Sequence, residues 1–566
     1  MVSQPHAPIL PSYTSSTADK PLLGMTIGDK FDEIVAQYPD NDALIVLHQD
    51  IHWTYKQLQE EVNRVARGLL ALGVQAGDRV AIWAPNCSEW TLTQFATAKI
   101  GAILVNINPA YRTHELEYAL NQSGARFLIT ADSFKSSDYR GMLVELAPEL
   151  KASAEGKLKS QKLPELEGVI NLSSEKYDGM WRWQDLLDHA NQISQTDVDD
   201  LQATLQFDDP INIQYTSGTT GFPKGATLSH HNILNNGFFV AESMGFTSED
   251  RLVIPVPLYH CFGMVMGNLG CVTHGAAMIY PGEGFDPESV LKAVHSQRAT
   301  ALYGVPTMFI AELDHPDFSS FDLSSLRTGI MAGSICPAEV MKQVIDKMNM
   351  KGVQIAYGMT ETSPVSTQTG ADDSIDKRVS TVGRTQPHLE SKIVDPGSGG
   401  ILPRGEIGEL CTRGYSVMLK YWSNEKATEE AIDEAGWMHT GDLATMDDEG
   451  YVQIVGRIKD MVIRGGENVY PKEIEEFLYT HPGVSEVQVT GVPDKKYGEE
   501  LIAWVKLNGK QDVTDEELRE FCKGKITHFK IPRYFKFVDE FPMTVTGKIQ
   551  KFKMREISIE ELGLEK

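Results

Sequence analysis

Short apolar runs alternate with amphipathic helical patterns in the first part of the chain, and this alternation most limits the possible folds. Residues 79–84 (RVAIWA), 101–107 (GAILVNI) and 126–130 (RFLIT) are each typical of a buried strand. Apolar residues also recur every three or four positions over residues 58–72, which predicts a helix that ends at Gly73. Strands that alternate with helices predict an α/β fold in which helices pack on a mostly parallel sheet.

The domain organisation follows from breaks in this pattern. A polar, Pro-rich start predicts a loose segment over residues 1–25, followed by a large α/β domain over residues 26–457. Within it, residues 131–200 are rich in Lys, Ser and Glu and are expected to form a surface excursion. A hinge is expected at residues 458–460, and a small α+β domain over residues 461–566. That domain should contain a hairpin from near residue 461, a helix from near residue 471, strands from near residues 485 and 501, and a second helix from near residue 514.

The composition is that of a globular enzyme of several domains. The 566 residues include 52 basic and 78 acidic side chains, a formal charge of −26, with 41% hydrophobic and 23% charged residues. These values exclude collagen-like, disulfide-scaffold and wholly disordered chains. The acidic excess argues against nucleic acid as a partner but does not exclude a small phosphate ligand in a local site.

The expected compartment is the cytoplasm. Six scattered cysteines without a C-x-x-C pair make disulfides and structural zinc unexpected, which fits a reducing compartment. The N-terminus has no apolar signal-peptide core, and its first arginine is Arg64. The most apolar long stretch, residues 264–280, contains Asn268 and His274 and is short for a bilayer span. No integral membrane segment and no peroxisomal C-terminal signal are expected.

The sharpest local motif is the loop at residues 215–225, YTSGTTGFPKG. It follows a strand-like INIQY run and precedes a helix-like segment that begins near Ser229. Its glycines allow a close backbone approach, and its hydroxyls, backbone N–H groups and Lys224 can bind phosphate oxygens. A flexible Ser/Gly/Thr turn is the plain alternative. Because Lys224 is followed by Gly225, the loop is not a Walker A motif, which disfavours a P-loop GTPase or kinase.

This loop resembles the phosphate-binding loop of the adenylate-forming (AMP-binding) superfamily, which contains acyl-CoA synthetases, luciferases and peptide-synthetase adenylation domains. Four further motifs follow in the family's order: YGMTET, GWMHTGD, GRIKD and PMTVTGK, at residues 357–362, 436–442, 456–460 and 542–548. The whole match is most similar to the medium-chain fatty acid–CoA ligases. The N-terminal third fits in layout but carries no diagnostic motif.

The resemblance implies a set of functional residues. Lys548, Thr360, Glu361 and Lys224 are the implied catalytic residues, and Glu361 and Thr216 the implied Mg²⁺ ligands. Tyr357 is expected to stack on adenine, and Asp442 and Arg457 to bind the ribose. The plain alternative for Tyr357 is an aromatic residue of the core. For Arg457 it is a surface ion pair, and for Glu361 it is a solvated carboxylate in a loop. The implied ATP or AMP contacts are Thr216, Ser217, Gly218, Thr219, Thr220, Gly221, Phe222, Pro223, Lys224, Gly333, Ser334, Tyr357, Gly358, Thr360, Asp442, Arg457 and Lys548.

The resemblance also implies that the small domain rotates between two half-reactions. Lys459 is the expected pivot, and Lys548 is expected to face the site during acyl-AMP formation. In the second half-reaction, Gly465 and Gly466 are expected to line a narrow channel for CoA. An ordinary glycine turn and a surface lysine in a basic tail are the alternatives.

The acyl pocket is expected among mostly apolar or small residues: His260, Val305, Ala332 and Ala356. A Cys261–His260 nucleophile is rejected, because adjacent residues rarely face one another and acyl transfer here needs no enzyme thioester. Cys261 is expected to be a small packing residue. A pocket without Lys or Arg favours an aliphatic monocarboxylic acid of short to medium length.

The predicted function is an ATP- and Mg²⁺-dependent carboxylic acid–CoA ligase that works through acyl-AMP, with CoA as co-substrate. An aryl-CoA ligase, a carrier-protein loading enzyme and a luciferase-like enzyme remain alternatives. An amino-acid adenylation domain is disfavoured, because no acidic residue lies between Asp250 and Glu283. A nucleotide-binding protein without catalysis would be expected to lack Lys548, Glu361 or Asp442. The expected partners are the small-molecule acid, ATP and CoA, and a homodimer is compatible with this function.

Overall fold

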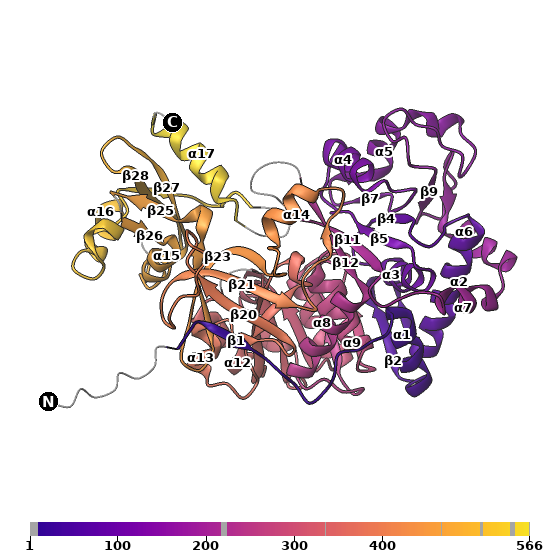
Figure 1. Ribbon diagram of the computed structural model, residues 1–566, viewed down its shortest axis with the longest axis horizontal. Helices are drawn as coiled ribbons and strands as arrows, with labels where there is room; N and C mark the ends of the chain where they lie inside the picture. Colours follow the sequence, from indigo (N-terminus) through magenta and orange to yellow (C-terminus); the bar gives the residue numbers. More distant parts are fainter. Residues whose placement is uncertain are drawn as a thin grey trace. The chain divides into compact units, whose positions relative to one another are not determined.

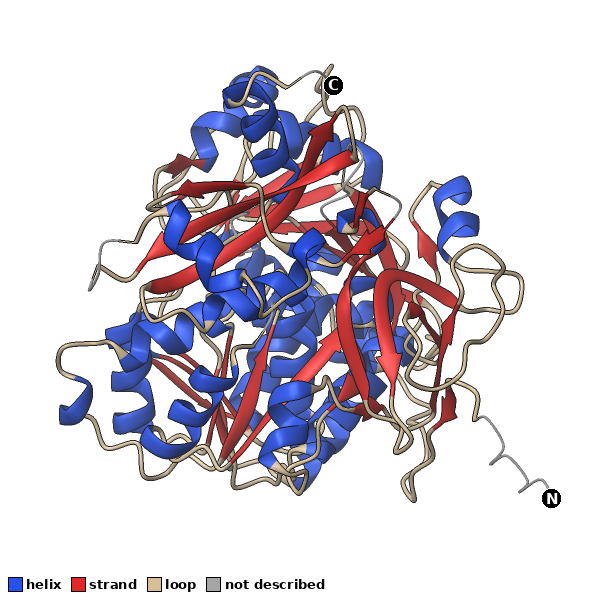
Figure 2. Cartoon of the chain, turned by 90° about the vertical axis from the view of Figure 1, so that its left-hand side faces the viewer, coloured by secondary structure: helices blue, strands red, loops and turns tan. Residues whose placement is uncertain are grey.

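The computed structural model describes residues 10–216, 223–333, 336–465, 467–509, 513–543 and 549–564. The chain divides into two compact units. Figure 1 labels its helices and strands and colours them along the sequence. The large unit comprises residues 14–391 and 412–438, and the small unit comprises residues 1–13, 392–411 and 439–566. Strands and helices alternate along much of the chain, as the sequence predicts for an α/β protein. Figure 2 shows the two kinds of element in different colours.

A nine-stranded sheet forms one layer of the large unit. Its six inner strands, in the order β17-β16-β15-β13-β14-β2, run parallel, and antiparallel strands β18, β19 and β3 complete its edges. Its strands are β2 (Asp42–Val46), β3 (Ile51–Thr54), β13 (Arg251–Val253), β14 (Ala277–Tyr280), β15 (Ala301–Gly304), β16 (Thr328–Ala332), β17 (Gly352–Gly358), β18 (Val365–Gln368) and β19 (Arg384–Thr385).

An eight-stranded sheet forms a second layer, in the order β10-β9-β6-β4-β5-β11-β12-β22. Its strands are parallel from β10 to β11, whereas β12 and β22 are antiparallel. The three apolar runs predicted as strands are confirmed as β4, β5 and β6. The strands are β4 (Arg79–Trp83), β5 (Ile103–Asn106), β6 (Phe127–Thr130), β9 (Gly168–Asn171), β10 (Trp181–Arg182), β11 (Pro210–Thr216), β12 (Lys224–Ser229) and β22 (Lys420–Tyr421).

Helices of the large unit share a core with one face of both sheets. This core includes side chains of α1 (Ile27–Gln37), α2 (Tyr55–Ala71), α3 (Ser88–Ile100), α8 (His230–Ser243) and the π-helix η4 (Phe262–Leu269). The predicted helix is confirmed as α2, which begins after a Thr54–Gln57 capping box. Separate cores cover the opposite sheet faces, with side chains of α4 (Thr113–Ser123), α5 (Tyr139–Leu146), α10 (Pro287–Gln297), α11 (Pro306–Leu313) and α12 (Ala338–Lys347).

The expectation of a surface excursion over residues 131–200 is wrong. This segment supplies β9 and β10 to the eight-stranded sheet and also forms β7 (Ser133–Phe134), β8 (Ser137–Asp138), α5, α6 (Trp183–His189) and α7 (Gln195–Gln202). Its polar residues separate apolar side chains that are buried in the core beneath α4 and α5, among them Tyr139, Leu143, Leu150 and Val169. The average composition of the segment therefore concealed its amphipathic pattern.

The small unit carries a five-stranded sheet that contains β26 (Glu467–Val469), β25 (Val462–Arg464), β28 (Gly498–Leu507), β27 (Val484–Asp494) and β29 (Tyr534–Phe537). Its helices are α15 (Pro471–Tyr479), α16 (Asp515–Cys522) and α17 (Lys551–Glu561). The hairpin, the two long strands and the helices near residues 471 and 514 are confirmed. Side chains of α15, α16 and the long strands form the core of this sheet.

A further sheet has the strand order β1-β20-β21-β23-β24. The chain passes from one unit to the other within strands of this sheet. Its strands are β1 (Tyr13–Ser15), β20 (Leu389–Val394), β21 (Gly408–Gly414), β23 (Met438–Met446) and β24 (Val452–Arg457). The expected hinge, residues 458–460, forms the short 3₁₀ turn η7 (Ile458–Asp460) directly after β24. The domain bounds proposed from the sequence stay a prediction. Among the described residues, no helix is both long and apolar enough to cross a membrane.

Candidate functional site

In the large unit, several predicted ATP-site residues lie where parallel strands of the two large sheets end. Thr216 is the last residue of β11, Gly333 follows β16, and Tyr357 and Gly358 end β17. Ligands of open α/β sheets bind at such carboxyl edges. Gly358 is required by the packing, because a Cβ atom there would lie 1.7 Å from the carbonyl oxygen of Pro364.

The phosphate loop connects β11 to β12, which pair as an antiparallel hairpin with Thr216 opposite Lys224. Residues 217–222 of this loop lie outside the described residues, as does Ser334. The sequence predicts a helix near Ser229, and Ser229 is indeed the N-cap of α8. It does not predict β12, which precedes that helix and fixes the backbone of Lys224 at the edge of the loop.

Glu361 lies in the 3₁₀ turn η6 (Thr360–Thr362), which follows β17. Glu361 is 5% exposed, and its Oε1 atom accepts a 2.7 Å hydrogen bond from the hydroxyl of Tyr421. Burial, and then the adjacent Glu361 carboxylate, raise the pKa of Tyr421, so its hydroxyl remains a hydrogen-bond donor. The Nζ atom of Lys224 lies 4.9 Å from the centre of the Tyr421 ring. Tyr421 belongs to none of the five sequence motifs.

The small unit holds Asp442 and Arg457. They are register partners on β23 and β24, and the Nε atom of Arg457 lies 2.9 Å from Oδ1 of Asp442. The Asp442 side chain is 9% exposed, whereas that of Arg457 is 54% exposed. Arg457 therefore forms an ion pair, which is the plain alternative to its role in ribose binding. The partner in this ion pair is Asp442, the carboxylate that is itself expected to bind the ribose.

Glu409 of β21 holds the turn that precedes Asp442. Its Oε1 accepts a hydrogen bond from the Gly441 N–H at 3.1 Å, and its Oε2 lies 2.8 Å from Nδ1 of His439. The Sγ atom of Cys411 lies 3.5 Å from the same nitrogen. Ligand atoms of Glu409, Cys411 and His439 lie within 4.8 Å of one another, a spacing that a metal ion could use. Because both Glu409 oxygens already serve these hydrogen bonds, we interpret the cluster as a brace for the turn.

The remaining predicted residues of the small unit are Lys459, Gly465, Gly466 and Lys548. Lys459 lies in η7, and Gly465 turns between β25 and β26 with φ +63°. The N–H of Gly465 donates to the carbonyl oxygen of Tyr497 at 2.8 Å. Gly466 and Lys548 lie outside the described residues.

Three of the four residues predicted to hold the acyl group lie on, or directly after, neighbouring strands of the nine-stranded sheet. Ala332 and Ala356 are register partners on β16 and β17, and Val305 follows β15. A Cβ atom on Gly333 would lie 3.1 Å from Val305, so these residues are close neighbours. His260 lies just before η4, and its Nδ1 atom accepts a hydrogen bond from the Phe262 N–H at 3.2 Å.

Cys261 has the features of a packing residue. It is fully buried, and its thiol donates to Oε1 of Gln214 at 3.1 Å. Burial raises the pKa of this thiol, which leaves little of the reactive thiolate. Gln214 and the neighbouring Asn106 are buried polar side chains that tie β11 and β5 to the segment around Cys261, because Asn106 donates to the carbonyl oxygen of Tyr259 at 2.9 Å.

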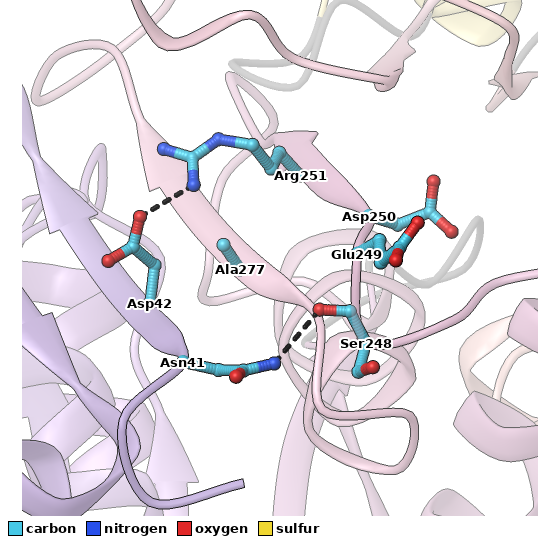
Figure 3. A pocket seen from close by; sticks show the side chains of 7 residues that line it. All are labelled: Asn41, Asp42, Ser248, Glu249, Asp250, Arg251 and Ala277. Carbon is cyan, nitrogen blue, oxygen red and sulfur yellow. Dashed lines mark hydrogen bonds and ion pairs between the residues drawn. The ribbon is translucent and has the colours of Figure 1, made fainter.

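A pocket of about 230 Å³ lies at the opposite edge of the nine-stranded sheet (Figure 3). Asp42, Arg251 and Ala277 line it, and each is the first residue of its strand. An ion pair of 2.6 Å joins Arg251 to Asp42, and Asn41 donates to the carbonyl oxygen of Ser248 at 3.1 Å. The pocket contains none of the predicted site residues. These contacts join the strand starts to one another.

Comparison with known protein families identifies the chain. The family model described as AMP-binding enzyme matches residues 31–422, and the AMP-binding enzyme C-terminal domain matches residues 473–548. The chain belongs to the AMP-binding enzyme family. Within this family it is an acyl-CoA synthetase, an acid–thiol ligase that uses ATP and CoA.

Individual relatives of this AMP-binding enzyme span almost its whole length. It is 53% identical over 543 residues to YngI of Bacillus subtilis, whose name assigns it to the acyl-CoA synthetases, with 96% of this chain and 99% of that one covered. It is 45% identical to the human medium-chain acyl-CoA ligase ACSF2, mitochondrial, with 100% of this chain and 92% of that one covered. Among solved structures, ATP-bound MatB from Rhodopseudomonas palustris is 30% identical, with a TM-score of 0.81 and 95% and 100% covered.

Proposed function

We propose that this acyl-CoA synthetase activates aliphatic monocarboxylic acids of short to medium chain length. The observation that carries the proposal is the set of small or apolar residues at the ends of β15, β16 and β17, namely Val305, Ala332 and Ala356. None of them offers a charge to a second carboxylate, which would be costly to bury unpaired. The medium-chain activity named for the human relative supports the same substrate class.

The proposed reaction has two steps. The substrate carboxylate attacks the α-phosphorus of ATP, which forms acyl-AMP and releases pyrophosphate. The thiol of CoA then attacks the acyl carbon, which forms the thioester and releases AMP with the thiol proton passing to solvent. Because the first step brings anions together, catalysis must come mainly from alignment and charge neutralisation.

We assign the ATP contacts as the sequence motifs imply. The residues of the phosphate loop, Thr216 to Lys224, would bind the phosphates, with Thr360 at the α-phosphate. Tyr357 would stack on the adenine, Gly333, Ser334 and Gly358 would be further ATP contacts, and Asp442 and Arg457 would bind the ribose. Lys548 would contact both the carboxylate and the α-phosphate.

Glu361 is suited to bind Mg²⁺. Its carboxylate is a hard oxygen donor of the kind that this ion prefers. Oε1 is oriented by Tyr421, and among the described residues Oε2 has no hydrogen-bond partner, so it is available for a metal ion. Thr216 would be the second protein ligand, at the start of the phosphate loop. When bound, the ion would neutralise charge on the phosphate oxygens.

The two half-reactions are proposed to use two placements of the domain over residues 461–566 relative to that over residues 26–457. Lys459, in the short turn η7, would be the pivot. Gly465 and Gly466 would line the CoA channel in the second placement, since a glycine turn lets the backbone approach a narrow ligand.

A reducing compartment, the cytoplasm in our proposal, is supported by the cysteines. All six lie among the described residues as thiols that form no disulfide, and five of them are buried. A homodimer is compatible with the proposal, and sedimentation velocity would decide the oligomeric state.

The substrate class can be tested with a panel of saturated fatty acids. Each buried methylene contributes about 0.8 kcal/mol, which is about fourfold in kcat/KM, until the chain reaches the pocket floor. We therefore expect kcat/KM to rise from acetate to a medium-chain optimum and then to fall. Pyrophosphate release and thioester formation should be measured with and without CoA. A preference for aromatic or charged acids, or a flat profile, would contradict the substrate assignment, and adenylation without thioester would favour another acceptor.

The ribose assignment predicts a selective loss of ATP affinity. In Asp442→Asn the charged acceptor for the ribose hydroxyls is lost, which costs about 1.5–3 kcal/mol, so KM for ATP should rise about 10- to 150-fold. The matched control is Asp448→Asn, an exposed carboxylate in the turn after β23. An unchanged KM for ATP in Asp442→Asn would remove Asp442 from the ATP site.

A further inference from the structure

Tyr421 occupies a position between the two halves of the proposed phosphate site. It lies on β22, whose backbone pairs with β12 through Tyr421 opposite Ala226. Shortly before it in the chain, the Met418 N–H donates to the carbonyl oxygen of Glu361 at 2.9 Å. The segment from Met418 to Tyr421 therefore connects the strand that begins at Lys224 with the turn that contains Glu361.

The side chain of Tyr421 contacts the charged groups of both halves. Its hydroxyl donates to Glu361 at 2.7 Å, and the ammonium of Lys224 lies 4.9 Å from the ring centre, within the range of a cation–π interaction. Tyr421 and Glu361 are each 5% exposed, so their hydrogen bond is removed from water, whereas Lys224 is half-buried. The Tyr421 N–H donates to the hydroxyl of Thr428, on α14 (Glu425–Ala431), at 3.0 Å, and this bond fixes the backbone that carries the ring.

Opposite charges this near to one aromatic ring would otherwise be expected to pair with each other. In the described part of the chain, however, Lys224 and Glu361 form no ion pair, and each contacts a different part of Tyr421. The lysine keeps its charge available for phosphate, and the carboxylate keeps Oε2 available for a cation. The ring therefore satisfies both groups without neutralising either.

We propose that Tyr421 is a positioning residue for acyl-AMP formation. Its hydroxyl orients the Glu361 carboxylate for Mg²⁺, and its ring holds Lys224 at the edge of the phosphate loop. This inference rests on the proposed function, in which Glu361 binds the metal ion and Lys224 the phosphates. Partners that orient a metal ligand in this way are typically worth 10- to 100-fold in metal affinity or activity.

The decisive variant is Tyr421→Phe, which removes the hydroxyl and keeps the ring. We expect the apparent dissociation constant for Mn²⁺ in the presence of ATP, followed by electron paramagnetic resonance of free Mn²⁺, to rise about 10- to 100-fold. The Mg²⁺ concentration for half-maximal pyrophosphate release should rise by a similar factor, whereas KM for ATP at saturating Mg²⁺ should change less than about threefold. Thioester formation from supplied acyl-AMP should be nearly unchanged.

A matched control separates positioning from general destabilisation. Tyr55 is also buried, and its hydroxyl donates to the carbonyl oxygen of Ala276 at 2.7 Å, within the core of the large unit. Tyr55→Phe removes an equivalent hydroxyl and should leave both Mn²⁺ binding and Mg²⁺ dependence unchanged. Tyr421→Leu removes the ring as well, so it should also raise KM for ATP about tenfold relative to Tyr421→Phe.

A double-mutant cycle with Glu361→Gln tests whether the two residues act together. If Tyr421 acts through Glu361, then Tyr421→Phe should change Mn²⁺ binding by less than about threefold in the Glu361→Gln background. Additive effects, or wild-type Mn²⁺ binding by Tyr421→Phe, would overturn the proposal. A wild-type enzyme that releases no pyrophosphate with any acid would instead contradict the proposed function, and the Mn²⁺ measurement, which needs no acid, would still test Tyr421.

Discussion

Replacing Lys548 with alanine should slow acyl-AMP formation by about 10²- to 10³-fold, the cost of removing one preorganised donor that stabilises charge in the transition state. The attack of a carboxylate on the α-phosphorus of ATP brings two anions together. Lys548 is the cation that the PMTVTGK motif would present to both of them. The effect should appear in kcat for pyrophosphate release at saturating acid and ATP.

The same variant should retain the second half-reaction. If the small domain rotates between steps, Lys548 has left the site when CoA attacks, so thioester formation from supplied acyl-AMP should fall by less than about threefold. Lys553→Ala is the matched control, because Lys553 is an exposed lysine of the same basic segment. Equal losses in both half-reactions would argue against domain rotation.

The fold class could be predicted because local pattern determines the individual elements. The runs at residues 79–84, 101–107 and 126–130 are apolar throughout most of their length, as expected for strands covered on both faces, and they form β4, β5 and β6. Their neighbours in the sheet could not be predicted. The order β6-β4-β5-β11 depends on pairing between segments far apart in the chain, and apolar periodicity carries no information about it.

Two errors have a common physical origin. Residues 131–200 contain many polar residues, yet Tyr139 and Leu143 are fully buried because they lie on one face of α5. The strand β12 (KGATLS) is short and contains few large apolar residues, but its backbone pairs with both β11 and β22. In each case tertiary packing decided the structure, and average composition did not indicate it.

Residues inside a motif could be named from the sequence, whereas their supporting partners could not. Asp442 and Glu361 stand within motifs with recognisable neighbours. Tyr421 and Glu409 act through hydrogen bonds to residues 60 and 32 positions away, Glu361 and Gly441 respectively. Such pairs become visible only when strands are placed side by side. The sequence around Tyr421 or Glu409 carries no signal of which residue its side chain will contact.

Substitution of Glu312 is expected to give the largest change in the free energy of unfolding. This residue of α11 is fully buried, and neither carboxyl oxygen has a hydrogen-bond partner among the described residues. Burial raises the pKa of Glu312 well above its ordinary value. The folded state therefore keeps a proton that the unfolded chain releases, so the free energy of unfolding should decrease as the pH rises above about 4.5. The slope should reach about 1.4 kcal/mol per pH unit until the folded-state pKa is passed.

Two substitutions separate the charge from the buried polar atoms. Glu312→Gln removes the titration, so its advantage over the wild type should be small near pH about 4.5 and grow as the pH rises. Glu312→Met also removes the unpartnered polar atoms, which should add about 1–3 kcal/mol at every pH. Urea unfolding followed by circular dichroism between about pH 4.5 and 8 would measure both effects. Parallel pH profiles for the wild type and Glu312→Gln would contradict the burial of an unpaired carboxyl group. We expect the free energy of unfolding of Glu312→Gln to exceed that of the wild type by an amount that grows with pH, because the amide cannot ionise. The free energy of unfolding of Glu312→Met should exceed that of Glu312→Gln by a constant amount, because the amide still lacks a hydrogen-bond partner.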